Sequence, residues 1–311
     1  MKVLVTGGAG YIGAMLVPQL LADGHHVTVV DTMWFGNGCL PDNDHLTVIK
    51  GDVRSMAQMK TASRDQEVVI CLASISAEAM CQKDQVLARS VNVDGVQRAA
   101  ISAKEAGVRR FIFASSVAAY GNSCNYVTEE AKLKPTTIYG ECKAEGEKLV
   151  WESFPEAIIV RSASVCGYSP HQRLDLMVNM MVHDAARKSV ITVNGGEQKR
   201  SHIHIKDICD AYKLLLSAPD HWVEGQAFNL VCDNQSVMDT AKMVARVFND
   251  RHIQILTRPR SDTRSYTVDG NKARIHLGFS PEKSIENAIH DLKIRFDSGY
   301  WPDSQTNVAY M

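Results

Sequence analysis

The chain begins Met1-Lys-Val-Leu-Val-Thr-Gly-Gly-Ala-Gly-Tyr-Ile-Gly13, and this stretch decides the fold. Its apolar residues Val3–Val5 predict a short buried strand, and an apolar pattern with helical spacing follows the last glycine. Glycines at such a strand-to-helix turn let the backbone approach a pyrophosphate, whose charge the helix N-terminus favours. The stretch therefore predicts a dinucleotide site. The residues we expect against the cofactor are Gly7, Gly10, Tyr11, Ile12 and Gly13.

Asp31 indicates which dinucleotide is bound. It ends the next apolar run, His26–Val30, which predicts the second strand. An acidic side chain about 20 residues after the glycines can accept hydrogen bonds from the adenosine ribose hydroxyls. The same carboxylate would repel the 2′-phosphate of NADP, and no arginine follows it directly. We therefore expect NAD as the cofactor.

Three further residues predict chemistry. Tyr139 and Lys143 are four residues apart in a segment with a helical pattern, so they share one face of that helix. The ammonium, together with a positive nicotinamide ring, would favour the phenolate of Tyr139. Ser116 ends the strand predicted at 109–115, at the carboxyl edge where ligands bind in open α/β sheets. The set predicts proton abstraction by Tyr139 near neutral pH.

With these residues in order, the sequence resembles the extended short-chain dehydrogenase/reductases, in particular the NAD-dependent nucleotide-sugar epimerases and dehydratases of the UDP-glucose 4-epimerase kind. The matching segments are Thr6–Gly13, Asp31, Gly51–Val53, Leu72–Ala73, Asn92–Gly95, Ser115–Ser116, Tyr120–Gly121, Tyr139–Lys143, Arg161, Gly195–Gly196, Arg200, Asp207 and Leu277–Pro281. The resemblance covers most of the chain. It implies that Ser116, Tyr139 and Lys143 are catalytic, and that Tyr139 and Lys143 also contact the cofactor.

The resemblance implies further cofactor-binding residues. Asp52 and Val53 follow the third predicted strand, where the family's acidic residue pairs with adenine. Leu72 and Ala73 would line the cofactor by backbone contacts. Asn92 resembles an asparagine on a helix that faces the cofactor, although a buried residue that ties the helix to a strand is an equally good interpretation.

Substrate-binding residues are implied in the same way. Arg200 matches the arginine that holds the diphosphate of a sugar nucleotide, and a guanidinium can donate two parallel hydrogen bonds to phosphate. A second phosphate-binding arginine is expected among Arg258, Arg260 and Arg264, in a segment one residue out of register with the family's Arg-Pro-Gly-Asp. Ser164 stands where the family often has an asparagine that touches the substrate. We therefore expect a different sugar pocket.

Composition predicts a globular chain with a sizeable hydrophobic core. The 311 residues are 45% hydrophobic and 22% charged, and the net charge of −1 indicates neither nucleic-acid nor membrane binding. The 8 cysteines form no C-x-x-C pair, which is typical of the reducing cytoplasm. His202 and His204 share a face of a predicted strand but lack further metal ligands, so we expect no metal. The resemblance implies a homodimer through helices near 86–107 and 138–153.

Strands and helices alternate up to about residue 165. This alternation predicts an α/β fold with a Rossmann-like, doubly wound parallel sheet, in which residues 1–165 form the NAD-binding domain. Residues 166–311 are predicted to form a smaller α/β substrate-binding region, some elements of which could return to the first domain. The strands expected in the first part are 2–6, 26–31, 46–50, 67–72, 109–115 and 157–162. The elements expected in the second part are helices at 175–188, 207–217, 236–249 and 283–297 and a strand pair near 191–193 and 201–205.

Val117 and Ala118 reduce the number of reactions that the resemblance allows. Dehydratases of the resembled family carry Asp-Glu directly after the catalytic Ser or Thr, and decarboxylases often carry Glu at the first position, whereas Val and Ala cannot transfer a proton. This favours an epimerase that oxidises the sugar at C4 and reduces it again on the other face, recycling its NAD. The alternatives are an NAD(P)-dependent nucleotide-sugar 4-keto reductase with exchangeable cofactor and a non-catalytic dinucleotide-sensing regulator. The intact Ser116, Tyr139 and Lys143 argue against the regulator.

Overall fold

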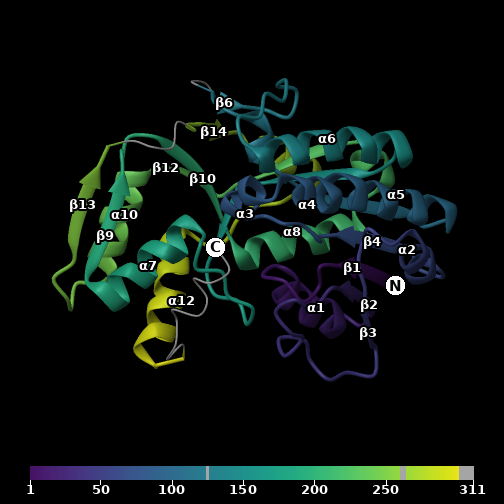
Figure 1. The fold of residues 1–311 in the computed structure, drawn as a ribbon, viewed down its shortest axis with the longest axis horizontal. Helices are drawn as coiled ribbons and strands as arrows, with labels where there is room; N and C mark the ends of the chain where they lie inside the picture. Colours follow the sequence, from purple (N-terminus) through teal and green to yellow (C-terminus); the bar gives the residue numbers. More distant parts are fainter. Residues whose placement is uncertain (124–125, 260–263, 301–311) are drawn as a thin grey trace.

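A computed structural model describes residues 1–123, 126–259 and 264–300. Its largest element is a parallel sheet with the strand order β11-β7-β5-β4-β1-β2-β3 (Figure 1). Its strands are β1 (Lys2–Thr6), β2 (His26–Asp31), β3 (Leu46–Lys50), β4 (Val68–Cys71), β5 (Arg110–Ser116), β7 (Ile158–Ser162) and β11 (Ala227–Leu230). The strand order reverses beside β1. This is the doubly wound Rossmann-like fold, which confirms the predicted fold class.

Helices cover both faces of the sheet because the strands are apolar on both sides. In β1, Val3 and Val5 pack with α1 and α8, whereas Leu4 belongs to the opposite core with α2, α5 and α6. All three side chains are fully buried, as expected for a central parallel strand. The helices of this part are α1 (Gly13–Ala22), α2 (Met56–Ser63), α3 (Glu78–Lys83), α4 (Gln85–Arg89), α5 (Val96–Glu105), α6 (Ile138–Ser153) and α8 (Ile205–Ser217). Between α4 and α5 the chain makes a π-helical turn, Ser90–Gly95.

A smaller region, drawn on the left of Figure 1, has its own core between α7, α10 and α12. Its elements are β8 (Ser164–Cys166), α7 (Met177–Lys188), β9 (Val190–Asn194), β10 (Lys199–His204), β12 (Asp233–Ser236), α10 (Val237–Val247), β13 (Gln254–Arg258) and α12 (Ile285–Asp297). The predicted pairing of the strands near 191–193 and 201–205 is wrong. Instead β9 pairs with β13, and β10 lies between β8 and β12.

Some late segments return to the large sheet. β11 pairs with β7 at its edge, and α8 packs against the face that also holds α1. Two short pieces, β6 (Tyr126–Val127) and β14 (Thr267–Val268), pair with each other, and α9 (Asp220–Val223) and α11 (Asn271–Leu277) complete the fold. In the part of the chain that the structure describes, no helix is long and apolar enough to cross a membrane.

The turn between β1 and α1 requires glycine at two positions for steric reasons. Gly7 has φ of +72°, and a Cβ there would lie 2.6 Å from the backbone nitrogen of Ala73. A Cβ at Gly13 would lie 2.4 Å from the carbonyl oxygen of Gly8. Any side chain at either position would push β1 away from the loop after β4 or open the turn. The glycine spacing therefore reflects tight packing around the carboxyl end of β1.

His202 on β10 predicts a pH dependence of stability. It is 1% exposed, and burial, with a further contribution from the Arg200 guanidinium, lowers its pKa from 6.5 to about 4. Between these two values the unfolded chain binds a proton that the folded chain does not, so stability falls as pH falls through this window. At about pH 5 the expected loss relative to neutral pH is about 2 kcal/mol from this residue.

Urea unfolding at about pH 7 and about pH 5 measures this effect. In His202→Gln the loss of stability between the two values should be smaller than in the unchanged protein. The matched control is His221→Gln, which alters an exposed histidine on α9 and should keep the full loss. An identical pH dependence in the unchanged protein and His202→Gln would contradict the prediction.

Candidate active site

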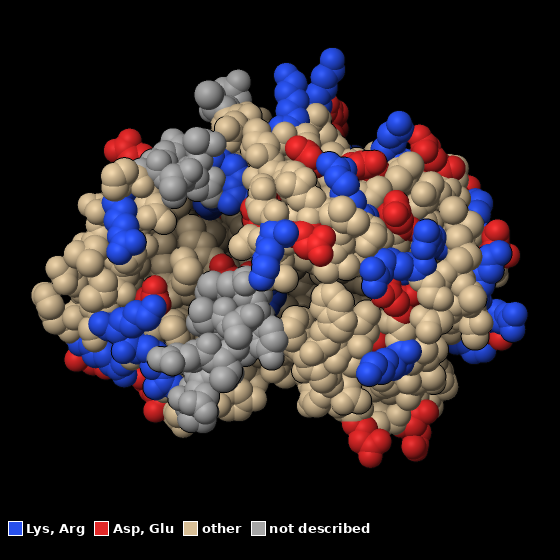
Figure 2. All heavy atoms as spheres, in the orientation of Figure 1, with Lys and Arg blue, Asp and Glu red and all other residues tan. Residues whose placement is uncertain are grey.

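A cavity of about 760 Å³ lies between the carboxyl edge of the large sheet and the smaller region. Its walls come from the loops after β1, β2, β3, β4 and β5, from the start of α6, and from β8, α7, β9 and β10. Figure 2 shows the surface hollowed between these two parts of the molecule, with Lys and Arg interspersed with Asp and Glu across the visible face. The cavity lies where open α/β sheets bind their ligands.

Ser116, Tyr139 and Lys143 meet at this cavity. Ser116 is the last residue of β5, and its hydroxyl interacts with the phenol of Tyr139, which lowers the pKa of that phenol. Tyr139 is the second residue of α6, a helix that begins where the Thr137 side chain accepts a hydrogen bond from the backbone N–H of Gly140 (3.1 Å). Lys143 follows one turn later and donates from Nζ to the carbonyl oxygen of Ala114 (2.7 Å). The structure therefore brings the three predicted catalytic residues together.

Burial dominates the electrostatics of this group. Burial raises the pKa of Tyr139 to about 12, against the lowering effects of the Arg173 guanidinium and the Ser116 hydrogen bond. Burial also lowers the pKa of Lys143 to about 8. In the protein without its cofactor, burial outweighs these opposing effects. That Tyr139 acts as a base near neutral pH with the nicotinamide ring in place stays a prediction. The largest lowering effect on the pKa of Tyr139 comes from the Arg173 guanidinium, in a segment without a recognised motif.

A buried ion pair fixes β5 relative to α6. Glu147, one turn beyond Lys143, accepts hydrogen bonds from Arg161 on β7 at 2.7 to 3.2 Å, and these two side chains are 1% and 4% exposed. The hydroxyl of Ser115 donates to the same carboxylate. Because Ser115 precedes Ser116, this contact sets the end of β5 against the helix that carries Tyr139. A buried pair of this kind contributes to precise positioning, whereas removing one partner leaves a costly unpaired charge.

The predicted cofactor residues occupy the part of the cavity along β1, β2 and β4. Those that line it are Gly7, Gly10, Tyr11, Ile12, Gly13, Asp31, Asp52, Val53, Leu72, Ala73, Tyr139 and Lys143. The Asp31 carboxylate accepts hydrogen bonds from the backbone N–H groups of Ala9 (3.1 Å) and Met33 (2.9 Å), so it also fixes the glycine turn. Asp52 pairs with Arg54, which lowers the pKa of its carboxyl group.

Asn92 does not line the cavity. It lies fully buried in the π-helical turn, where its side-chain oxygen accepts from Ser74 (3.0 Å) and from the backbone N–H of Ile75 (2.8 Å). Its amide group donates to the carbonyl oxygen of Ile75 (2.8 Å). The proposed contact with the cofactor is therefore corrected. Asn92 shapes the loop after β4 and acts on the cavity only through Ser74 and Ile75.

The predicted substrate residues separate into three groups. Ser164 and Arg200 line the cavity, and Arg200 is 7% exposed with its guanidinium donating to the carbonyl oxygen of Lys199 (3.0 Å). Arg258 does not line the cavity but is exposed at the end of β13, which pairs with β9 in a sheet separate from that of β10. Arg260 lies outside the described residues. Arg264, the third candidate, lines the cavity beside Arg200.

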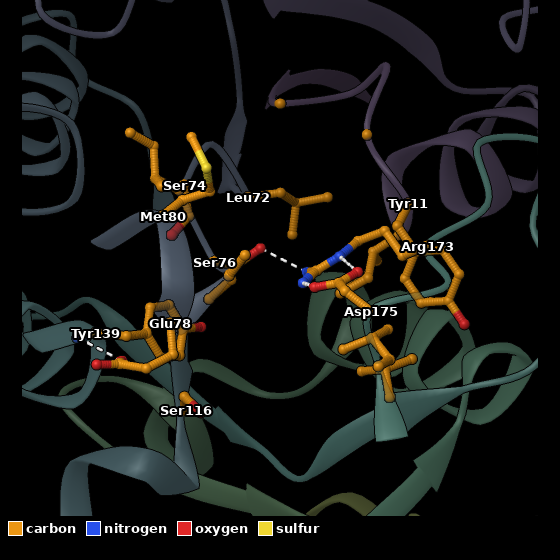
Figure 3. Close-up of a pocket in the computed structure, with 18 of the residues that line it drawn as sticks. Tyr11, Leu72, Ser74, Ser76, Glu78, Met80, Ser116, Tyr139, Arg173 and Asp175 are labelled. Atoms are coloured by element: carbon orange, nitrogen blue, oxygen red, sulfur yellow. Dashed lines mark hydrogen bonds and ion pairs between the residues drawn. The ribbon is translucent and has the colours of Figure 1, made fainter. Parts of the chain in front are cut away.

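Several residues without a sequence motif complete the cavity (Figure 3). Arg173 and Asp175 precede α7, and the Arg173 guanidinium donates to Asp175 (2.9 Å) and to the hydroxyl of Ser76 (2.6 Å). On the opposite side Glu78 accepts from the backbone N–H of Tyr139 (3.1 Å). Arginine and aspartate two residues apart are too common in sequences to predict a site, and only the tertiary fold brings these residues next to Tyr139.

Asp31 provides a test of cofactor choice. Asp31→Ser should narrow the preference for NAD over NADP, because it removes a negative charge from the region expected to receive the ribose 2′ position. Asp31→Asn is the matched control for the backbone contacts, because its side-chain oxygen can still accept from Ala9 or Met33. Dissociation constants for both dinucleotides give the comparison. An unchanged protein that already binds NADP more tightly would contradict the assignment.

The fold and cavity define a dinucleotide-dependent enzyme, and comparison with known proteins gives its family. Residues 3–230 match the model of the NAD dependent epimerase/dehydratase family. This match covers most of the chain, and the protein belongs to that family. It is therefore an NAD-dependent enzyme, as the sequence predicted.

Individual relatives are similar along nearly the whole chain. A UDP-glucose 4-epimerase of Lactobacillus helveticus is 27% identical, over 93% of this chain and 95% of the relative. A dTDP-D-glucose 4,6-dehydratase of Mus musculus is also 27% identical, over 93% of this chain and 86% of the relative. Among solved structures, MoeE5 in complex with UDP-glucuronic acid and NAD is 26% identical, with a TM-score of 0.86 over 96% of this chain and 100% of that chain. Relatives with two different activities are thus equally similar.

Proposed function

We propose that the protein is an NAD-dependent nucleotide-sugar epimerase that inverts C4 through a transient 4-keto sugar. The observation that carries this proposal is the arrangement of Ser116, Tyr139 and Lys143 in a cavity that extends to Arg200. The relatives that are epimerases, and the MoeE5 structure with its nucleotide sugar and NAD, support the same class of substrate.

The residues of the cavity fit NAD. Gly10 and Gly13 let the backbone turn approach a pyrophosphate, since a Cβ at Gly10 would meet only the carbonyl oxygen of Gly7 at 3.2 Å and would otherwise extend toward the cavity. Asp31 lies at the ribose end, and Tyr139 and Lys143 lie at the end where the reaction occurs. When bound there, NAD would supply the acceptor and then the donor of the hydride of the sugar carbon.

The proton is handled by Tyr139. The Ser116 hydroxyl, which lies beside Tyr139, holds the sugar hydroxyl, and the Tyr139 oxygen removes its proton as the carbonyl forms. The ammonium of Lys143 stays protonated below about pH 8 and is fixed by Ala114, so it adds a positive charge beside the tyrosine. Arg173 contributes a second positive charge that favours the phenolate. After the ketone turns in the site, Tyr139 returns the proton.

The far end of the cavity suits the diphosphate of the substrate. Arg200 and Arg264 lie there together, on β10 and on the segment before β14. Guanidinium groups are well matched to phosphate oxygens, and a partly buried charge binds them more strongly than an exposed one. We infer that Arg200 and Arg264, rather than Arg258, hold the nucleotide diphosphate.

The cavity lacks, among its described residues, a carboxylate that is not already bound by protein groups, and this favours epimerisation over dehydration. Water elimination needs an acid and a base near the sugar, but Val117 and Ala118 occupy the cavity wall after Ser116. Each cavity carboxylate within the described ranges is already engaged by protein groups. Asp31 and Glu78 accept backbone N–H groups, Asp52 pairs with Arg54, and Asp175 pairs with Arg173.

The purified protein, incubated with UDP-, GDP-, CDP- and dTDP-sugars, tests the proposal. We expect one pair of C4 epimers to interconvert, detected by NMR, without added cofactor. Turnover that consumes NAD(P)H stoichiometrically would identify a 4-keto reductase instead, and loss of water in the mass spectrum would identify a dehydratase. A homodimer through the helical segments near 86–107 and 138–153 and a cytoplasmic location remain predictions.

A further inference from the structure

The segment between β8 and α7, residues 167–175, which we call the strap, runs along one wall of the cavity. His171, Gln172 and Arg173 of the strap line the same cavity as the glycine turn. The strap contacts the loops that follow β1, β2 and β4, which are neighbours in the sheet. A dinucleotide on the glycine turn lies along the carboxyl ends of these same strands.

The first contact holds the strap to the glycine turn. The hydroxyl of Tyr11 donates to the carbonyl oxygen of Gly167 (2.7 Å), and the hydroxyl of Ser169 donates to the carbonyl oxygen of Tyr11 (2.8 Å). Asn179 on α7 donates to the same Tyr11 hydroxyl (3.1 Å). These groups are buried, so this end of the strap is firmly attached.

The strap itself is braced by Gln172. Its side-chain oxygen accepts from the backbone N–H of Ser169 (3.0 Å), and its amide group donates to the carbonyl oxygen of Gly167 (3.3 Å). At the other end Arg173 reaches Ser76 in the loop after β4 (2.6 Å). The strap is therefore held at both ends and keeps its own shape between them.

The middle contact is of a different kind. Phe35, in the loop after β2, packs against His171 of the strap, with ring centroids 5.3 Å apart and an angle of 45° between the rings. Phe35 is 49% exposed, so it contributes little to the core. Both rings line the cavity, on the side of Asp31. Their contact joins the loop after β2 to the strap, beside the part of the cavity expected to hold the adenosine half of a dinucleotide.

We propose that Phe35 and His171 form a clasp that closes the strap over bound NAD and retains it between turnovers. The inference rests on the proposed function, because an enzyme that returns its hydride to the sugar has no need to release the cofactor. A reductase must exchange NAD(P) in every cycle, and for it such a clasp would limit the rate. Retention of NAD by these two residues would therefore suit an epimerase better than a reductase.

The rate of NAD release tests the clasp. Protein loaded with NAD is mixed with excess deuterated NAD, and native mass spectrometry follows the exchange. Loss of an aromatic contact changes a rate by about two- to tenfold, so Phe35→Ala and His171→Ala should each release NAD faster by that factor. His171→Phe keeps a ring against Phe35 and should release NAD slowly. Trp222→Ala, which removes an exposed ring on α9 outside the cavity, is the matched control.

The double variant decides whether the contact itself matters. If it does, Phe35→Ala with His171→Ala should release NAD no faster than either single variant. Release at the unchanged rate in both single variants, or additive effects in the double variant, would overturn the proposal. Thermal unfolding confirms that each variant folds. The exchange assay contains no nucleotide sugar, so it tests the clasp independently of the proposed function. Failure of the proposed function would appear in the other assay, as absence of epimer interconversion.

Discussion

Tyr139→Phe is expected to lower kcat at least about a hundredfold, the usual scale for loss of a general base. The substitution removes one oxygen, which in the structure contacts Ser116, and leaves a ring of the same shape. The helix that carries it should persist, because Thr137 caps α6 through the backbone of Gly140. Steady-state rates with the epimer pair identified above give the measurement.

Two controls separate chemistry from structure. NAD binding and the thermal unfolding temperature of Tyr139→Phe should stay close to those of the unchanged protein. Tyr126→Phe makes the same chemical change in an exposed tyrosine on β6 outside the cavity, and it should keep full activity. Near-normal turnover in Tyr139→Phe would remove the central claim about the mechanism.

Arg200→Ala is expected to raise KM for the nucleotide sugar about ten- to a hundredfold. A hydrogen bond to a charged group contributes about 1.5–3 kcal/mol, and each 1.4 kcal/mol is a factor of ten in affinity. The affinity for NAD should change little, because the glycine turn and Arg200 lie at different ends of the cavity. A lower kcat is also expected, since binding energy at the diphosphate orients the reacting carbon.

The chain provides a matched control for this variant. Arg258→Ala removes an exposed arginine that does not line the cavity, so it should leave KM unchanged. Arg200 also contacts the backbone of Arg264 and lies 5.7 Å from the ring of Tyr266, so the dissociation constant for NAD and the unfolding temperature are measured in the same protein. Equal losses for sugar and NAD would indicate a folding defect. No loss in either would show that Arg200 does not bind substrate.

The sequence predicted well those parts of the site whose constraints are local. The turn requires glycine at Gly7 because φ is +72° there and at Gly13 because the backbone of Gly8 lies so close. Thr137, Tyr139 and Lys143 lie within two turns of one helix. The helix predicted at 138–153 has those bounds in the structure. In such segments the residue types and their spacing are enough to predict how the side chains lie relative to one another.

The sequence failed where geometry depends on distant pairing. The strands near 191–193 and 201–205 have similar patterns, but each finds a partner elsewhere in the chain, and this moves Arg258 away from the cavity. The same holds for Arg173, which reaches Ser76 across 97 positions of sequence. Such contacts leave no periodic signal. They follow from how β8, β10 and α7 pack against the large sheet.

The return of β11 and α8 to the large sheet limits how the protein can be divided. A fragment cut near residue 165 would leave the edge of β7 unpaired and uncover the apolar residues of β1, such as Val3, that α8 now covers. Exposed strand edges and apolar faces promote aggregation. The late segments thus complete the sheet and core of the first region, and we expect substitutions within the substrate region to be tolerated better than its exchange as a separate module.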